Sequence, residues 1–239
     1  MTGLTLRDRK VFPEALRSSH LVAERLGVNA VEVDVTPLNR AAGVYRYVGY
    51  RLPRSVAARL ARLSRARRGY NVLIERMRGE DRRTRDAFVA INARQRLRMV
   101  TTYRYAEINR LLVVGAAQRT ERLLGLFVKF GVDDAADIAP LKHLYRTQIV
   151  AIAEKVGVPG EVLARPPSGE MLPGDRDKYL DVLKIPVSTV DLVLWGIEHE
   201  MADADIARDV QVDRAKVAEI RQITRLSAHM QEPSQSPDL

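Results

Sequence analysis

The apolar segment that begins at Leu111 constrains the fold of this chain more than any other feature. Four apolar residues in succession, LLVV at 111–114, are typical of a strand buried in a parallel sheet. Small residues follow at 115–117, and Glu121 comes next, at the start of an expected helix. The carboxyl end of a strand that leads into a helix is a preferred place for an anionic ligand. The segment therefore predicts a ligand site within an α/β fold.

Lys129 lies two helical turns beyond Glu121 in the sequence. If one helix continued across this interval, both side chains would lie on the same face. The predicted anion site needs a cation or a metal ligand, and these two residues would supply both.

The N-terminal part of the sequence predicts a βαβ unit. A short strand is expected at Gly3–Leu6, followed by a helix over Pro13–Leu26 that stops at Gly27. Apolar and polar residues then alternate at 31–35, which is the period of a half-exposed strand. A strand, a helix and a strand at this spacing form a parallel sheet with a right-handed crossover.

The rest of the pattern is mostly helical. One long helix is expected over Phe88–Ile108 and another over Thr147–Val156. A third is expected to begin with Ser188 as its N-cap and to run to Glu200. The residues that this third helix should bury are Val190, Leu192, Val193, Leu194 and Trp195.

The segment 44–86 is rich in arginine and also contains Tyr45, Tyr47, Tyr50 and Tyr70. We expect a solvated basic helix or a mobile insertion, with a flap or a dimer-facing segment over a nucleotide as the functional alternative. Tyrosines among arginines are also found where bases stack. The formal net charge of +9 favours an anionic partner, but it does not separate a nucleotide from a nucleic acid.

Composition excludes several kinds of site. The chain has no cysteine, which excludes disulfides, zinc–thiolate sites and cysteine nucleophiles. No apolar run has the length of a membrane span and no signal peptide is recognisable, so we expect a cytoplasmic protein. The pair His199–Glu200 lacks the second histidine that a helical zinc site requires.

Four motifs carry a resemblance to a known family. They are ARQRLRM from Ala93, GAAQRTERLLGLFVKFGVDDAAD from Gly115, IAPLKHLYRTQIVAIAEKVGVP from Ile138 and RPPS from Arg165. In this order they resemble the ammonia-dependent NAD synthetases, over most of the chain. The resemblance implies an adenine-nucleotide hydrolase-like α/β fold, with a three-layer parallel sheet, helices on both faces and a helical C-terminal appendage. It also implies that ATP drives the amidation of deamido-NAD by ammonia to NAD, with release of AMP and pyrophosphate.

The resemblance also implies the domain organisation and the partners. Residues 1–187 would form the nucleotide-binding domain, with 44–86 as a basic insertion. Residues 188–230 would form the appendage, and 231–239 a flexible tail. A homodimer is implied, and a separate glutaminase is an expected source of ammonia.

The resemblance assigns roles to nine residues. Those expected to bind deamido-NAD are Arg96, Lys129, Asp137 and His229. Those expected to contact ATP are Gly115, Ala116, Arg146 and Ser168. Glu121 is expected to bind Mg²⁺, because hard cations bind carboxylates. Ala116 replaces a threonine of many family members, which removes one hydrogen bond, worth on the order of 1 kcal/mol.

One family motif is absent from the sequence. The family's first strand leads into an SGGxDS loop that grips the ATP pyrophosphate, and no such sequence occurs here. Because that strand is central in the family's sheet, we expect an open slot in its place. Either the true start codon lies upstream, which we favour, or the chain is a truncated and inactive relative.

Residues 202–225 have the pattern of a helix-turn-helix. Ile206, Val217 and Ile220 would pack, and Arg221 would be exposed. A DNA-binding regulator is therefore an alternative function. The second helix lacks a dense basic stripe, so a structural appendage is favoured and nucleic-acid binding is not expected.

Overall fold

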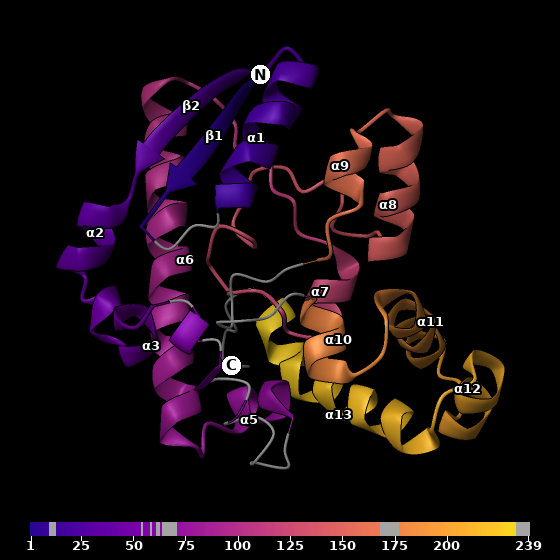
Figure 1. Cartoon of the computed structure of the whole chain (residues 1–239). Coiled ribbons are helices and arrows are strands. Elements are labelled where there is room, and N and C mark those ends of the chain that lie inside the picture. Colours follow the sequence, from indigo (N-terminus) through magenta and orange to yellow (C-terminus); the bar gives the residue numbers. More distant parts are fainter. Residues whose placement is uncertain are drawn as a thin grey trace, which may run out of the picture.

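The computed structural model describes residues 1–9, 13–53, 55–57, 59–60, 63, 71–167 and 177–232. Its elements, in chain order, are β1 (Thr2–Arg7), α1 (Pro13–Arg25), β2 (Asn29–Asp34), α2 (Thr36–Ala41), the 3₁₀ helix η1 (Val44–Arg46), α3 (Val48–Arg51), α5 (Val72–Arg78), α6 (Arg82–Ile108), α7 (Arg119–Leu123), α8 (Arg146–Lys155), α9 (Gly160–Leu163), α10 (Lys178–Leu183), α11 (Val187–Glu198), α12 (Asp203–Val210) and α13 (Arg214–Gln231) (Figure 1).

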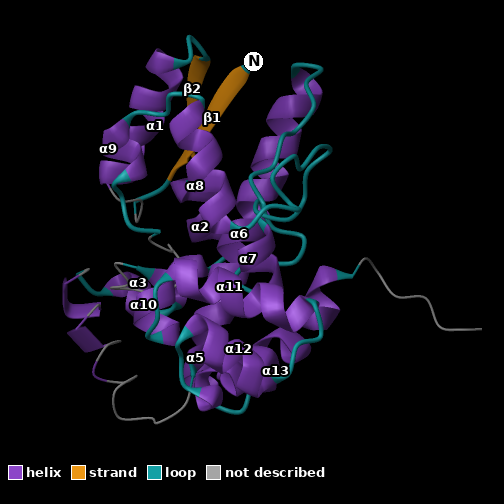
Figure 2. Ribbon diagram, turned by 90° about the vertical axis from the view of Figure 1, so that its right-hand side faces the viewer, coloured by secondary structure: helices purple, strands orange, loops and turns teal. Residues whose placement is uncertain are grey.

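The predicted N-terminal βαβ unit is confirmed. β1 and β2 pair in parallel, from Thr2 opposite Asn29 to Arg7 opposite Asp34. Between them, α1 ends before Gly27, which adopts a left-handed φ of 60°. Figure 2 shows α1 and α6 on opposite sides of the two strands. The strands are therefore the middle layer of a three-layer arrangement.

The long helix α6 is attached to the end of β1 by two arginines. Arg94 Nε donates to Asp8 Oδ2 at 2.7 Å, and both side chains are buried. Arg98 donates to the carbonyl oxygen of Leu6 at 2.9 Å. The predicted helix over Phe88–Ile108 thus exists as part of α6, and its basic residues hold it to the sheet.

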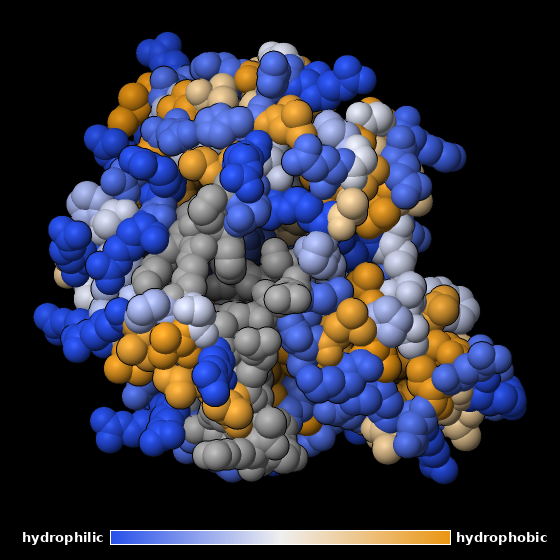
Figure 3. Space-filling view, viewed as in Figure 1, coloured by the Kyte–Doolittle hydropathy of each residue, from blue (hydrophilic) through white to orange (hydrophobic). Residues whose placement is uncertain are grey.

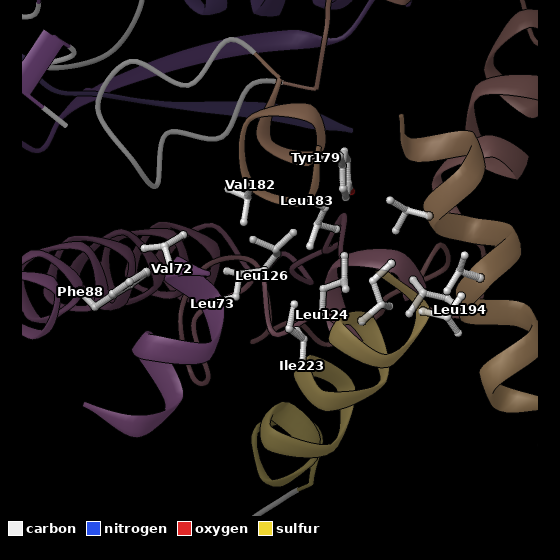
Figure 4. Packing of buried hydrophobic residues seen from close by; sticks show 14 of the residues in the cluster. Val72, Leu73, Phe88, Leu124, Leu126, Tyr179, Val182, Leu183, Leu194 and Ile223 are labelled. Atoms are coloured by element: carbon white, nitrogen blue, oxygen red, sulfur yellow. The ribbon is translucent and has the colours of Figure 1, made fainter. Parts of the chain in front are cut away.

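The main hydrophobic core lies below the two strands in the view of Figure 1, among α5, α7, α10, α11 and α13. Figure 4 shows its side chains meeting from these elements and from α6. Val190 and Val193 of α11 and Val217 and Ile220 of α13 are fully buried, as expected for apolar residues at helical spacing. The C-terminal helices therefore share one core with residues that precede them.

The sequence predicted a buried strand at 111–114, and most of this segment is exposed instead. Val113 is buried, but Leu112 and Val114 are 69% and 63% exposed. The strand is reduced to one parallel bridge between Val114 and Ile138. The physical reason is that, within the part of the chain that is described, β1 and β2 form the sheet and neither pairs with this segment.

Two details of α11 differ from the sequence prediction. Ser188 lies inside the first turn, because the helix begins at Val187 with Pro186 as its N-cap. Leu192 and Trp195, which were expected to be buried, are exposed. They lie on the face of the helix that points away from the core, since a helix with one packed side leaves its other side in solvent.

The tyrosines of the basic segment are structural where they are described. Tyr45 and Tyr50 are buried in a small cluster with Val44 and Ala90, and Tyr47 packs edge-to-face on Tyr50. Buried rings cannot stack on bases, so the base-stacking alternative is wrong for Tyr45 and Tyr50. Tyr70 and most of the expected helix around it lie outside the described residues.

The helix-turn-helix pattern corresponds to α12 and α13, and it packs inward. Ile206, Val217 and Ile220 belong to the main core. Arg221, which was expected to be exposed, donates to Asp203 Oδ1 at 2.7 Å and to the carbonyl oxygen of Met201 at 2.8 Å. This arginine therefore joins the two helices to each other.

The surface is mostly hydrophilic on the face shown in Figure 3, with hydrophobic side chains gathered over α10, α11 and α12. None of the described helices is both long and apolar enough to cross a membrane.

Candidate functional site

The predicted site begins where the segment around Val113 turns toward α7. The Val113 amide donates to Asp137 Oδ2 at 2.7 Å, and the Gly115 amide donates to the carbonyl oxygen of Ile138 at 2.8 Å. A Cβ atom on Gly115 would lie 2.7 Å from the Cβ of Ala136. The close approach that requires a glycine here is therefore made by the protein's own chain, whereas the sequence suggested the approach of a ligand.

The helix that carries Glu121 is much shorter than predicted. α7 ends at Leu123, and Gly125 then adopts a left-handed φ of 65°. Glu121 and Lys129 therefore do not share a helical face, and that prediction is wrong. The physical reason is that a glycine in the left-handed region ends a helix at little cost.

Three of the four residues predicted to bind deamido-NAD lie together. Arg96 Nε donates to the carbonyl oxygen of Lys129 at 3.3 Å. Lys129 Nζ donates to the carbonyl oxygen of His229 at 3.2 Å. Helix α6, the loop after α7 and the end of α13 thus meet at one place and bring two cationic side chains to it.

The fourth predicted residue, Asp137, lies next to the parallel bridge between Val114 and Ile138. Besides the Val113 amide, it accepts a hydrogen bond from the Tyr103 hydroxyl at 3.4 Å. Both contacts are with the protein, so in this structure Asp137 helps to hold the segment that leads to Gly115.

A buried polar network fixes α7 and the start of α8, and sequence reasoning missed it. The Thr120 hydroxyl donates to Asp191 Oδ1 at 2.6 Å. The amide and the hydroxyl of Thr147 donate to Asp191 Oδ2 at 2.9 and 2.8 Å. The signal that was available is the single acid in the apolar run VSTVDLVLW of α11, because a buried charge needs partners.

A second network joins the same three helices nearer the surface. Arg119 and the Tyr145 hydroxyl both donate to the Glu198 carboxylate. Burial and the hydrogen bond to Glu198 raise the pKa of Tyr145 above its usual value. The Tyr145 hydroxyl thus joins the start of α8 to the end of α11.

Arg122 joins the loop after α7 to the end of α13. Its guanidinium donates to Asp134 Oδ1 at 2.7 Å and to the carbonyl oxygen of Gln231 at 3.0 Å. Asp134 in turn accepts from the Phe130 amide at 3.0 Å. The loop that carries Lys129 is thus held from two sides.

The predicted ATP contacts come from separate segments, and Arg146 among them is the first residue of α8. The backbone N–H of Arg146 donates to Thr120 Oγ1 at 2.9 Å, which fixes this first residue of α8 next to α7. Ala116 is exposed in the loop that precedes α7. Ser168 lies outside the described residues.

The predicted metal ligand Glu121 already has a cationic partner. The Lys178 ammonium donates to its carboxylate, and burial lowers the pKa of Lys178 to about 8. Among the described residues, no group of three or more His, Asp or Glu side chains is arranged to hold a metal ion. One carboxylate paired with an ammonium does not fit a divalent cation in this arrangement.

Comparison with known proteins places the chain in a family. The sequence model of the family described as NAD synthase matches residues 66–234. The NH3-dependent NAD(+) synthetase of Coprothermobacter proteolyticus is 32% identical over 216 residues, which cover 85% of this chain and 71% of that protein. The NH3-dependent NAD(+) synthetase of Thermotoga maritima is 32% identical over 233 residues, which cover 94% of this chain and 78% of that protein.

Solved structures support the fold. The NMN synthetase from Francisella tularensis aligns with a TM-score of 0.68 at 20% identity, over 100% of this chain and 79% of that one. The NH3-dependent NAD synthetase from Campylobacter jejuni aligns with a TM-score of 0.63 at 14% identity, over 98% of this chain and 78% of that one. The predicted α/β fold, with a parallel sheet between helices, is thereby confirmed. With the sequence match over residues 66–234, the chain belongs to the NAD synthase family.

Proposed function

We propose that this chain amidates deamido-NAD to NAD with ammonia, in a reaction driven by ATP that releases AMP and pyrophosphate. Support comes from family membership and from relatives that bear the name NH3-dependent NAD(+) synthetase. The observation that carries the proposal in the structure is the meeting of Arg96, Lys129 and His229 from three distant segments. Two cationic side chains at one place suit a substrate that carries a pyrophosphate.

The proposed chemistry asks little of side chains as acids or bases. The rate would come from holding the carboxylate of deamido-NAD next to the α-phosphate of ATP and from neutralising charge there. Arg96, Lys129, His229 and Asp137 are the proposed contacts of the dinucleotide, and the first three lie together. The loop at 115–116, Arg146 and Ser168 are the proposed contacts of ATP.

Magnesium enters the proposal only as the ion that the family resemblance implies for ATP. Glu121 can serve as its ligand only if Lys178 is displaced, so no step is derived through the metal. A homodimer and a separate glutaminase as the source of ammonia are further parts of the proposal, and they rest on the resemblance. A cytoplasmic location is also proposed, and it rests on the sequence, in which no apolar run has the length of a membrane span.

A coupled assay tests this function directly. The purified chain is supplied with deamido-NAD, ATP, magnesium and an ammonium salt, and NAD and AMP are quantified in parallel. We expect both products to form in equal amounts. ATP and deamido-NAD that bind without turnover would instead identify an inactive nucleotide-binding relative. An absence of binding to either would overturn the proposal.

A substitution at Lys129 tests the proposed substrate contact. Lys129→Met removes a charge-assisted hydrogen bond to the dinucleotide, worth ~1.5–3 kcal/mol. We therefore expect kcat/KM for deamido-NAD to fall by about tenfold to about a hundredfold. Lys155→Met, at the exposed end of α8, removes the same charge away from the site and should leave kcat/KM unchanged. Equal activity in the two variants would contradict the role of Lys129.

A further inference from the structure

Glu121 and Lys178 form an ion pair between two elements that are far apart in the sequence. Glu121 lies on α7, and Lys178 is the first residue of α10. The side chains of Lys178 and Glu121 are only 13% and 17% exposed. Charges so far removed from water need a partner, because an unpaired buried charge is strongly destabilising. Each side chain therefore provides the counter-ion of the other.

The core holds both elements of the pair in place. On α10, Tyr179 and Leu183 are fully buried. On the other side, Thr120 of α7 is fully buried in its hydrogen bond to Asp191, and Leu124 after it is fully buried in the main core. The backbones that carry the two charges are thus anchored independently of the ion pair. The pair is a consequence of how the elements pack.

The nearest acid on Lys178's own side is engaged elsewhere. Asp177 caps α10, since its Oδ1 accepts from the amides of Tyr179 and Leu180 at 2.8 and 3.1 Å. The Lys178 ammonium reaches across to Glu121, and it lies 5.4 Å from the centre of the Tyr179 ring. The carboxylate of Glu121 is therefore the one that receives this cation.

We propose that Lys178 occupies the cation position at Glu121 and closes this carboxylate to divalent metal ions in the substrate-free chain. A metal ion bound by Glu121 would lie next to the Lys178 ammonium, and two cations that share one carboxylate repel each other. The described residues offer no preformed acidic cluster to offset that repulsion. Lys178 is thus a specificity determinant of the site, and it takes the position that the resemblance gives to magnesium.

Metal titration of the chain without substrates tests this inference. Mn²⁺ serves as the probe, and the Mn²⁺ that stays unbound is counted by electron paramagnetic resonance. We expect Lys178→Met to bind Mn²⁺ at least about tenfold more tightly than the wild type, because the repelling charge is gone. Adding Glu121→Gln to that variant should abolish the gain. Lys178→Arg keeps the charge and should match the wild type.

Two results would overturn the inference. In one, the wild type binds Mn²⁺ through Glu121 as tightly as Lys178→Met does. In the other, removal of Lys178 creates no binding that depends on Glu121. If Lys178→Met does not fold, as judged by circular dichroism, Lys178→Gln replaces it, because an amide can still donate to Glu121. Magnesium should then raise the Tm of Lys178→Gln and leave the Tm of the wild type unchanged, and equal shifts would also overturn the inference.

The inference stands on geometry and does not require the proposed function. No substrate is present in the titration, so a chain without ligase activity can still pass this test. Conversely, an active chain can fail it. The two failures are therefore distinguishable.

Discussion

At the scale of single residues, Asp191 is a buried acid whose carboxylate needs hydrogen-bond donors from other parts of the chain. It lies in α11, and its two oxygens receive donors from two other elements. Thr120 donates from α7, and Thr147 donates from α8 with both its amide and its hydroxyl. A carboxylate with this many donors is satisfied in the core, and its removal leaves those donors without a partner.

We predict that Asp191→Ala lowers the free energy of unfolding by about 2–4 kcal/mol, because buried donors then lose their acceptor. Urea denaturation followed by circular dichroism measures the change. The matched control is Asp205→Ala on α12, where the acid is exposed and paired with Arg208. That control should cost less than about 1 kcal/mol. Equal costs would show that the network of Asp191 contributes little.

The sequence predicted residues of the candidate site unevenly. Arg96, Lys129 and His229, which the family resemblance assigned to one substrate, lie together in the structure, and their roles stay a prediction. The partners of Thr120 and Glu121 could not be predicted, since each lies in a segment more than fifty residues away. A local pattern carries no information on which distant helix supplies the partner.

At the scale of elements, the end of α7 decides where the site loop goes. Gly125 follows α7 with a left-handed φ of 65° and turns the chain toward Lys129. A Cβ atom there would lie 2.6 Å from Met77 Cε and 2.7 Å from Ser227 Cβ. The position therefore requires glycine both for its backbone conformation and for its packing.

Two glycine substitutions separate these reasons. Gly157→Ala, after α8, has a φ of 78° but no atom within 4 Å of the added Cβ, so it should cost about 1–2 kcal/mol for the backbone alone. Gly125→Ala should cost about 1–3 kcal/mol more, because the methyl group overpacks the core. Thermal unfolding of both variants measures the difference. If the two lose the same stability, the contacts with Met77 and Ser227 adjust without strain.

The sequence predicted elements well where an apolar pattern continued over many residues or where a glycine or proline marked the end of an element. Helix α6 and the βαβ unit follow from such patterns. The length of α7 was wrong, because the apolar residues around Gly125 continue the helical spacing while the backbone turns. The start of α11 was also missed, since Pro186 is the N-cap and Ser188, the residue type that usually caps a helix, lies within the first turn. Backbone conformation at single residues decided both outcomes.

At the scale of the whole molecule, the segment 111–114 and its partner Ile138 leave several apolar side chains exposed. Leu112 and Val114 are exposed, as is Ile138 opposite Val114. The pattern predicted a strand covered on both faces, and the exposure of these side chains contradicts that prediction. Exposed strand-forming apolar residues tend to associate with other chains.

We predict that Leu112→Lys lowers concentration-dependent self-association, measured by light scattering, with little change in Tm. The charge blocks edge-to-edge pairing, and an exposed side chain contributes little to stability. Val89→Lys on α6 adds the same charge at a position that is similarly exposed and should leave the scattering unchanged. A similar decrease in both variants would attribute the effect to net charge.

Arg122 has a practical consequence for anyone who modifies this chain. Its guanidinium holds Gln231, the last residue of α13, together with Asp134 in the loop after Lys129. A bulky fusion partner attached just after Gln231 would disturb the hydrogen bond between Arg122 and the Gln231 carbonyl oxygen. Labels and affinity tags therefore belong on a spacer, because displacement of the Gln231 carbonyl group would remove a hydrogen bond of Arg122, which also holds the loop after Lys129.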